Sequence, residues 1–125
     1  MEEIARTILI IDDDSRNIFA LNAVLRSRGY RCLSAATVSD AVELIKGGSG
    51  IGIILMDMMM PDMDGYEAIS RIKNLVDTEK LPIISVTAQA MVGDRERCLQ
   101  AGADGYIAKP VDIDALVNLL KQYIG

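Results

Sequence analysis

The stretch IGIILMDMMMPDMDGYE, residues 51–67, decides the fold because it joins an apolar run to the start of a helix. Its first part, IGIILM, is continuously apolar and rich in isoleucine, which is typical of a strand buried on both faces of a parallel sheet. Asp57 follows this run directly, and Asp64 and Glu67 have the spacing of a helix capping pair. The stretch therefore predicts a strand, an aspartate at its carboxyl end and a helix over residues 66–75.

Four other apolar runs alternate with segments of helical periodicity along the rest of the chain. Strands are predicted over residues 7–11, 30–35, 82–86 and 105–108. Helices are predicted over residues 18–25, 38–46, 92–101 and 113–123. Strands and helices that alternate five times are typical of a doubly wound α/β domain. We therefore expect one domain over residues 1–125.

Composition and charge narrow the possible functions. Half of the 125 residues are hydrophobic and a quarter are charged, the balance of a soluble globular domain. No apolar run approaches the ~20 residues needed to span a bilayer, and the first residues do not resemble a signal peptide. We therefore expect a cytoplasmic protein with no direct membrane contact. The net charge of −5 and the lack of a basic run argue against direct binding of nucleic acid.

The chain contains no histidine. This excludes histidine-based catalytic triads, histidine-ligated metals and histidine acid–base catalysis within the chain. Cys32 and Cys98 do not form a Cys-x-x-Cys pair, and we expect both to be reduced, buried or half-buried side chains. Met58, Met59 and Met60 are consecutive, so their sulfurs cannot converge on one copper ion, and we expect them to pack.

Polar side chains follow four of the five predicted strands. In an open parallel α/β sheet, the carboxyl ends of the strands form the edge at which ligands bind. The residues at these positions are Asp12, Asp13 and Asp14 after the first strand, Asp57 after the third, Thr87 after the fourth and Lys109 after the fifth. Each alone has an ordinary explanation as a turn residue, strand terminus or solvated side chain. Together at one edge, they predict a functional site.

A cluster of Asp12, Asp13 and Asp57 requires a cation. Two like charges ~4 Å apart cost roughly 4 kcal/mol at an effective dielectric constant near 20. Oxygen ligands without histidine or cysteine favour Mg²⁺ or Mn²⁺, and Mg²⁺ leaves room for a phosphate oxygen because it takes few protein oxygens. A hard metal ion, an ionised carboxylate, a lysine and a hydroxyl group make up a site for phosphoryl transfer.

Four segments, ILIIDDD, LMDMMMPDMDGYE, ISVTAQAM and AGADGYIAKP, closely resemble the receiver domain of two-component response regulators. The resemblance runs from about residue 7 to residue 123. The segments DDDSRNIFAL and AMVGDRERCLQAGADGYIAKPVD are most similar to receivers of hybrid histidine kinases. The resemblance implies a flavodoxin-like (βα)5 fold, a doubly wound parallel sheet with strand order 2-1-3-4-5. It also implies a signalling role and not that of an enzyme.

The resemblance assigns a role to each acidic residue of the predicted site. Asp57 matches the phosphoacceptor, which attacks the phosphorus of a phosphohistidine. Asp13 and Asp12 match the acidic pair that holds Mg²⁺, the first directly and the second largely through water. The backbone carbonyl of Met59 matches a further protein ligand. Asp14 has no consistent counterpart and is left out of the metal site.

The resemblance also assigns roles to residues of the fourth and fifth strands. Lys109 matches the lysine that pairs with the acceptor carboxylate and then with a phosphoryl oxygen, and Pro110 matches a proline joined to it by a cis bond. Thr87 matches the hydroxyl that turns toward the phosphoryl group. Tyr106 matches the aromatic switch that reports this movement at the surface of the fourth helix, fifth strand and fifth helix, through which a phosphorylation-dependent dimer is expected.

Because the chain has no histidine, the phosphoryl donor must lie elsewhere. The resemblance implies a histidine kinase or a histidine phosphotransfer domain as partner, or a small donor such as acetyl phosphate. The chain is expected to be a stand-alone receiver or a cytoplasmic domain of a larger sensor kinase.

Three alternatives remain at this point. A receiver that binds partners without phosphorylation would share these motifs. An aspartate-nucleophile phosphatase would need a second aspartate where Met59 stands. An FMN-binding carrier of flavodoxin type would need a Ser/Thr/Gly-rich loop after the first strand, where three aspartates would repel the phosphate.

Met59 is also apolar and cannot orient a water, which predicts a long-lived phosphoryl group.

Overall fold

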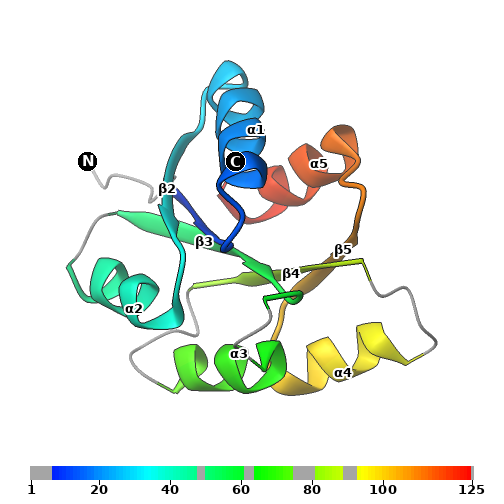
Figure 1. The fold of residues 1–125 in the computed structure, drawn as a ribbon. Coiled ribbons are helices and arrows are strands. Elements are labelled where there is room, and N and C mark those ends of the chain that lie inside the picture. The colour runs from blue at the N-terminus through cyan, green and yellow to red at the C-terminus, as the bar shows by residue number, and fades with distance from the viewer. Residues whose placement is uncertain (1–6, 48–49, 61–63, 75–80, 89–92, 125) are drawn as a thin grey trace.

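Five parallel strands form one sheet in a computed structural model that describes residues 7–47, 50–60, 64–74, 81–88 and 93–124. The strands are β1 (Thr7–Ile11), β2 (Arg31–Ala35), β3 (Ile51–Asp57), β4 (Ile83–Thr87) and β5 (Gly105–Ala108). They lie in the order β2-β1-β3-β4-β5, and every neighbouring pair is parallel. The predicted flavodoxin-like order 2-1-3-4-5 is therefore confirmed (Figure 1).

Helices cover both faces of this sheet. They are α1 (Ser15–Ser27), α2 (Val38–Lys46), α3 (Gly65–Lys73), α4 (Asp94–Ala101) and α5 (Ile113–Ile124). In Figure 1, α1 and α5 lie above the sheet and α2, α3 and α4 lie below it. The elements match the predicted segments to within a few residues, although the predicted helix ends at Leu75 and Val92 lie outside the described residues.

The central strands have no exposed face, as their continuous apolar runs predict. Every residue of β1 and of β4 is buried. Leu9 and Ile11 pack in the cluster shared with α2, α3 and α4, whereas Ile8 and Ile10 pack in the cluster shared with α1 and α5. Full burial of such a side chain contributes about 1.5–3 kcal/mol, so β1 alone anchors both layers. The edge strands β2 and β5 are only partly buried.

Side-chain caps start four of the helices at the carboxyl edge of the sheet, and at α5 the cap is Asp112. The carboxylate of Asp14 accepts from the N–H of Arg16 and begins α1, and Thr37 caps α2. Asp64 caps α3 by accepting from the N–H groups of Tyr66 and Glu67, which confirms its predicted role. These caps satisfy amide groups that a helix start leaves unpaired, and they fix the loops that surround the carboxyl edge.

The smaller sequence predictions have mixed outcomes. Cys32 and Cys98 are free, half-buried and buried respectively, as expected. Met58 and Met60 pack against the core, but Met59 is 40% exposed and does not share their environment. None of the helices in the described ranges is long and apolar enough to cross a membrane.

Candidate functional site

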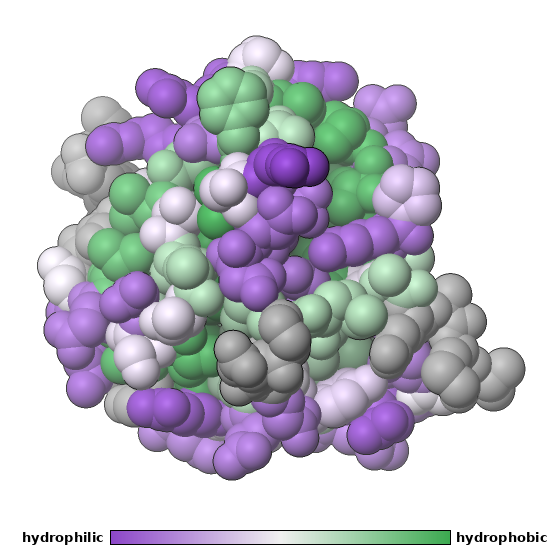
Figure 2. All heavy atoms as spheres, in the orientation of Figure 1, coloured by the Kyte–Doolittle hydropathy of each residue, from purple (hydrophilic) through white to green (hydrophobic). Residues whose placement is uncertain are grey.

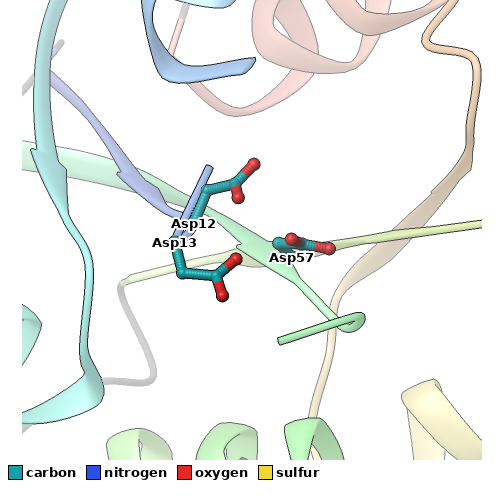
Figure 3. A group of neighbouring side chains, drawn as sticks. All are labelled: Asp12, Asp13 and Asp57. Atoms are coloured by element: carbon teal, nitrogen blue, oxygen red, sulfur yellow. The ribbon is translucent and has the colours of Figure 1, made fainter. Parts of the chain in front are cut away.

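Three carboxylates meet where β1 and β3 end. Asp12 and Asp13 follow β1, and Asp57 is the last residue of β3, the strand paired with β1. Each of the three offers a carboxylate oxygen within 4.8 Å of those of the other two. Figure 3 shows Asp12 and Asp13 reaching from the end of β1 toward the end of β3. Asp12 and Asp57 are buried, with 3% and 6% exposure, and Asp13 is exposed.

Backbone and lysine donors hold the two buried carboxylates. Asp57 Oδ1 accepts from the N–H of Met59 at 3.0 Å and from Lys109 Nζ at 3.2 Å. Asp12 Oδ1 accepts from the N–H of Asp14 at 2.9 Å. Lys109 reaches Asp57 because it follows β5, where its N–H donates to the carbonyl of Thr87 at 2.8 Å. The Lys109–Pro110 bond is cis, as the resemblance implies.

The electrostatics of the site favour a cation. Burial raises the pKa of Asp12 to about 6, the N–H of Asp14 opposes this rise, and the nearby charge of Asp57 adds to it. Three carboxylates face one ammonium group, so the site carries excess negative charge. The ligand set consists of oxygen atoms and is open on the side of Asp13, which fits Mg²⁺ or a similar hard divalent ion.

Thr87 and Tyr106 lie on β4 and β5, the strands next to the carboxylates and the lysine. Thr87 ends β4, is 1% exposed, and its hydroxyl lies 3.8 Å from the sulfur of Met59. Tyr106 lies in β5, and its hydroxyl donates to the carboxylate of Asp94 at 3.1 Å. Nothing in the sequence singles out Asp94, because an acidic residue in the first turn of a helix is ordinary. The structure thus brings Asp12, Asp13, Asp57 and Lys109 together directly, with Thr87 and Tyr106 on the adjacent strands.

Two cavities border the acidic group. A cavity of about 400 Å³ next to Asp13 is lined by residues that precede α2 and by residues of α3. A second cavity of about 280 Å³ lies between α1 and the segment that leads into α5, and it reaches Asp57 and Lys109. Figure 2 shows hydrophilic residues at the centre of this face, where β1 ends in Figure 1.

A sheet of order 2-1-3-4-5 with an acidic group at one edge and a lysine after β5 is the arrangement of a receiver domain. The family model described as response regulator receiver domain matches residues 8–121. The chain belongs to this family and is a receiver domain of two-component phosphorelay signalling. An FMN carrier finds no support, because its phosphate would face three carboxylates.

Relatives agree with this assignment. The chain is 40% identical over 116 residues to the sensor histidine kinase RcsC of Salmonella typhi, covering 93% of this chain and 12% of the kinase. The crystal structure of the receiver domain of sensor histidine kinase PA1611 from Pseudomonas aeruginosa, with a magnesium ion in its active site cleft, is 39% identical. Its TM-score is 0.83, with coverage of 96% of this chain and 98% of that chain.

A complex between a receiver and a phosphotransfer protein is also similar. The receiver domain of the Saccharomyces cerevisiae response regulator Ssk1, in co-crystals with the histidine phosphotransfer protein Ypd1, is 25% identical with a TM-score of 0.85. The similarity covers 99% of this chain and 92% of that chain. Among these similar structures, one receiver thus holds a magnesium ion and another is bound to a histidine phosphotransfer protein.

Proposed function

We propose that Asp57 is the phosphoacceptor of this receiver domain. The observation that carries the proposal is the contact of 3.2 Å between Asp57 Oδ1 and Lys109 Nζ within the group of three carboxylates. Asp57 is the one carboxylate of this group with a lysine partner among the described ion pairs. It also accepts the N–H of Met59, so its oxygens are oriented before a donor arrives.

In the proposed reaction, an oxygen of Asp57 attacks the phosphorus of a phosphohistidine on a partner protein. A P–O bond forms and the P–N bond breaks, and its electron pair stays on the imidazole nitrogen of the donor. Lys109 then turns from the carboxylate to a phosphoryl oxygen, where its charge stabilises the transferred group. The domain thereby assists its own phosphorylation and dephosphorylation without acting on a separate substrate.

Four groups would hold the metal ion, namely the carboxylates of Asp12, Asp13 and Asp57 and the backbone carbonyl of Met59. Exposed Asp13 suits a direct ligand, whereas buried Asp12 suits contact through water. The raised pKa of Asp12 supports a site that requires a cation. When bound, Mg²⁺ or Mn²⁺ supplies positive charge that offsets the carboxylates and the phosphoryl oxygens.

Thr87 and Tyr106 form the proposed switch. The phosphoryl group adds negative charge beside β4, and the Thr87 hydroxyl turns to donate to it. Tyr106 then settles into a second arrangement, which shifts the population of the surface formed by α4, β5 and α5. The exposed thioether of Met59 next to Thr87 cannot orient a water for hydrolysis, which supports a long-lived phosphoryl group.

The partners follow from the same chemistry. We assign a histidine kinase or a histidine phosphotransfer domain as the donor, and a dimer through α4, β5 and α5 after phosphorylation. We assign no direct nucleic acid or membrane partner. The whole chain, residues 1–125, is proposed to act as one receiver in the cytoplasm, alone or within a larger sensor kinase.

The test of this function is chemical modification of one residue. With Mg²⁺ and acetyl phosphate or phosphoramidate, the protein should gain one phosphoryl group that hydroxylamine removes. Asp57→Asn should abolish this gain, whereas Asp64→Asn, which changes the α3 cap outside the cluster, should retain it. Persistence of the modification in Asp57→Asn would overturn the assignment.

A further inference from the structure

A buried carboxylate outside the acidic site joins three elements of the fold. Asp94 is the first residue of α4 and is 6% exposed. Its Oδ1 accepts a hydrogen bond of 2.5 Å from the hydroxyl of Tyr66 in α3, and its Oδ2 accepts one of 3.1 Å from the hydroxyl of Tyr106 in β5. Tyr66, Asp94 and Tyr106 are called the tyrosine–aspartate cluster below.

The cluster is a main attachment of the amino-terminal end of α4. This helix reads DRERCLQA, and only Asp94 and Cys98 of its residues are buried. Its cap residue, Gly93, provides no side-chain hydrogen bond. Burial of a carboxylate costs free energy unless hydrogen bonds compensate it, and the two tyrosine hydroxyls do so here. The guanidinium of Arg97 lies 4.3 Å from the centre of the Tyr66 ring and adds a cation–π contact within the same group.

The Tyr66 side of the cluster leads to the phosphoacceptor. Tyr66 follows Gly65, whose backbone packs so closely on Met58 that an added Cβ would lie 2.5 Å from the Met58 Cε atom. Met58 in turn follows Asp57, and its N–H donates to the carbonyl of Val86 at 2.9 Å. The start of α3 is therefore packed directly against the segment that carries the reactive carboxylate.

The Tyr106 side leads to the lysine of the site. Tyr106 pairs with Ser85, and Ala108 pairs with Thr87, across β4 and β5. Lys109 follows Ala108 and donates its N–H to the carbonyl of Thr87 at 2.8 Å. Tyr106 therefore lies on the strand that leads directly to Lys109, from which this lysine reaches Asp57.

We propose that Asp94 is a positioning residue for phosphoryl transfer. By binding Tyr66 and Tyr106 with one carboxylate, it ties the start of α3 to β5, the two elements that lie beside Met58 and before Lys109. Donors that are already in place need no reorganisation during the reaction, so loosening them slows transfer. This role rests on the proposed function of Asp57 and Lys109, and it adds a residue of α4 that touches neither the phosphoryl group nor the metal.

The test compares rates in variants that remove one contact each. Asp94→Asn removes the charge and keeps the shape, and Tyr66→Phe removes one hydroxyl. Both should lower the rate constant of phosphorylation by phosphoramidate at saturating Mg²⁺ roughly 2- to 30-fold, while Mg²⁺ affinity stays unchanged. Tyr123→Phe is the matched control, because it removes a hydroxyl that donates to the carbonyl of Asp104 at 3.0 Å, away from the site. Its rate should equal that of the unmodified sequence.

Tyrosine ionisation gives a second measurement, which reports directly on the hydrogen bond between Tyr66 and Asp94. The hydrogen bond to Asp94 raises the pKa of Tyr66 to about 12, with burial as a smaller cause. An absorbance titration should show this late-ionising tyrosine in the unmodified protein and in Tyr123→Phe. In Asp94→Asn it should ionise closer to the ordinary value near 10.

The outcomes separate this inference from the proposed function. If Asp57→Asn is not phosphorylated but Asp94→Asn and Tyr66→Phe react at the full rate, only the role of Asp94 is overturned. A fall in rate that Tyr123→Phe shares, or that comes with weaker Mg²⁺ binding, also overturns it. Phosphorylation of Asp57→Asn overturns the proposed function itself.

Discussion

Among the residues that the structure describes, two aspartate–lysine pairs lie at opposite edges of the sheet, and they differ in what surrounds them. Asp57 and Lys109 meet at 3.2 Å where β3 and β5 end, and Asp104 and Lys73 meet at 2.8 Å where β4 and β5 begin. At the second edge, the carboxylate of Asp104 also accepts the N–H of Ile83 at 2.9 Å.

The difference lies in the balance of charge. One oxygen of the Asp104 carboxylate accepts from both Lys73 and the N–H of Ile83, and Lys73 also donates to the carbonyl of Leu81. The Asp57 carboxylate lies beside two carboxylates that have no lysine partner among the described ion pairs, and one of them has a pKa raised to about 6. The Asp104–Lys73 pair has balanced charges and stabilises the fold. The excess of negative charge around Asp57 favours binding of a metal ion, as expected of a functional site.

The largest expected effect concerns metal binding at the Asp57 edge. Asp13→Ala should weaken Mg²⁺ binding by about 100-fold, because a direct ligand should cost at least as much as an outer-shell residue. Asp14→Ala should change it little, since that carboxylate caps α1. Isothermal titration with Mg²⁺ measures both, and equal losses would mean that the ligands are assigned wrongly. Asp104→Ala should not alter Mg²⁺ binding at all.

The next largest effect is a change in the free energy of unfolding that has opposite signs at the two edges. Without divalent ions at pH 7, Asp12→Asn should raise the free energy of unfolding by about 2 kcal/mol, because it removes a buried charge and keeps an acceptor for the N–H of Asp14. Asp104→Asn should lower it by about 1 kcal/mol, because it removes the charge that Lys73 contacts. Urea unfolding measures both changes, and changes of the same sign would contradict the comparison.

The pH dependence sharpens this difference. The pKa of Asp12 in the folded state, about 6, lies above its ordinary value, so the folded state binds this proton more tightly. Asp12 therefore makes its full contribution to stability below its ordinary pKa near 4, where it is neutral. This contribution is lost as the pH rises through about 6. The advantage of Asp12→Asn without metal should therefore vanish near pH 4 and reach its plateau above pH 6. An advantage that is constant over this range would exclude the raised pKa.

The smallest effect belongs to the satisfied pair. Its side chains are 20% and 37% exposed, so solvent screens the attraction. Lys73→Met should lower the free energy of unfolding by about 0.5–1 kcal/mol, and the loss should shrink in high salt. Lys121→Met, a change of an exposed lysine in α5, provides the control and should have almost no effect. A larger loss that is insensitive to salt would indicate a structural role beyond the ion pair.

Most of the fold could be predicted from the sequence. Continuous apolar runs rich in β-branched residues, such as residues 7–11 and 51–56, are typical of strands in the middle of a covered parallel sheet, and the structure confirms them as β1 and most of β3. The strand order was predicted from the resemblance to a family, because an apolar run does not indicate which strand lies beside it in the sheet. The exposed position of Met59 was missed, because three consecutive methionines look alike as apolar side chains.

The candidate site was predicted unevenly for a similar reason. Asp12, Asp13, Asp57, Thr87 and Lys109 stand directly at strand ends, so the rule for parallel sheets was enough to group them. Asp94 does not stand at a strand end, so this rule does not identify it. Its partners Tyr66 and Tyr106 lie 28 and 12 residues away along the chain, and only packing of α3, α4 and β5 brings their hydroxyls to one carboxylate.

The sequence by itself thus determined the chemistry of this protein: no histidine, and carboxylates, a lysine and a hydroxyl at strand ends. Those properties depend only on residue type and on the local periodicity of apolar residues, and both can be read from the sequence. The tertiary structure alone decided the environment of each group, including the burial of Asp12, the contact between Asp57 and Lys109 and the tyrosine–aspartate cluster. Burial, distance and field arise only when segments far apart in the sequence pack together.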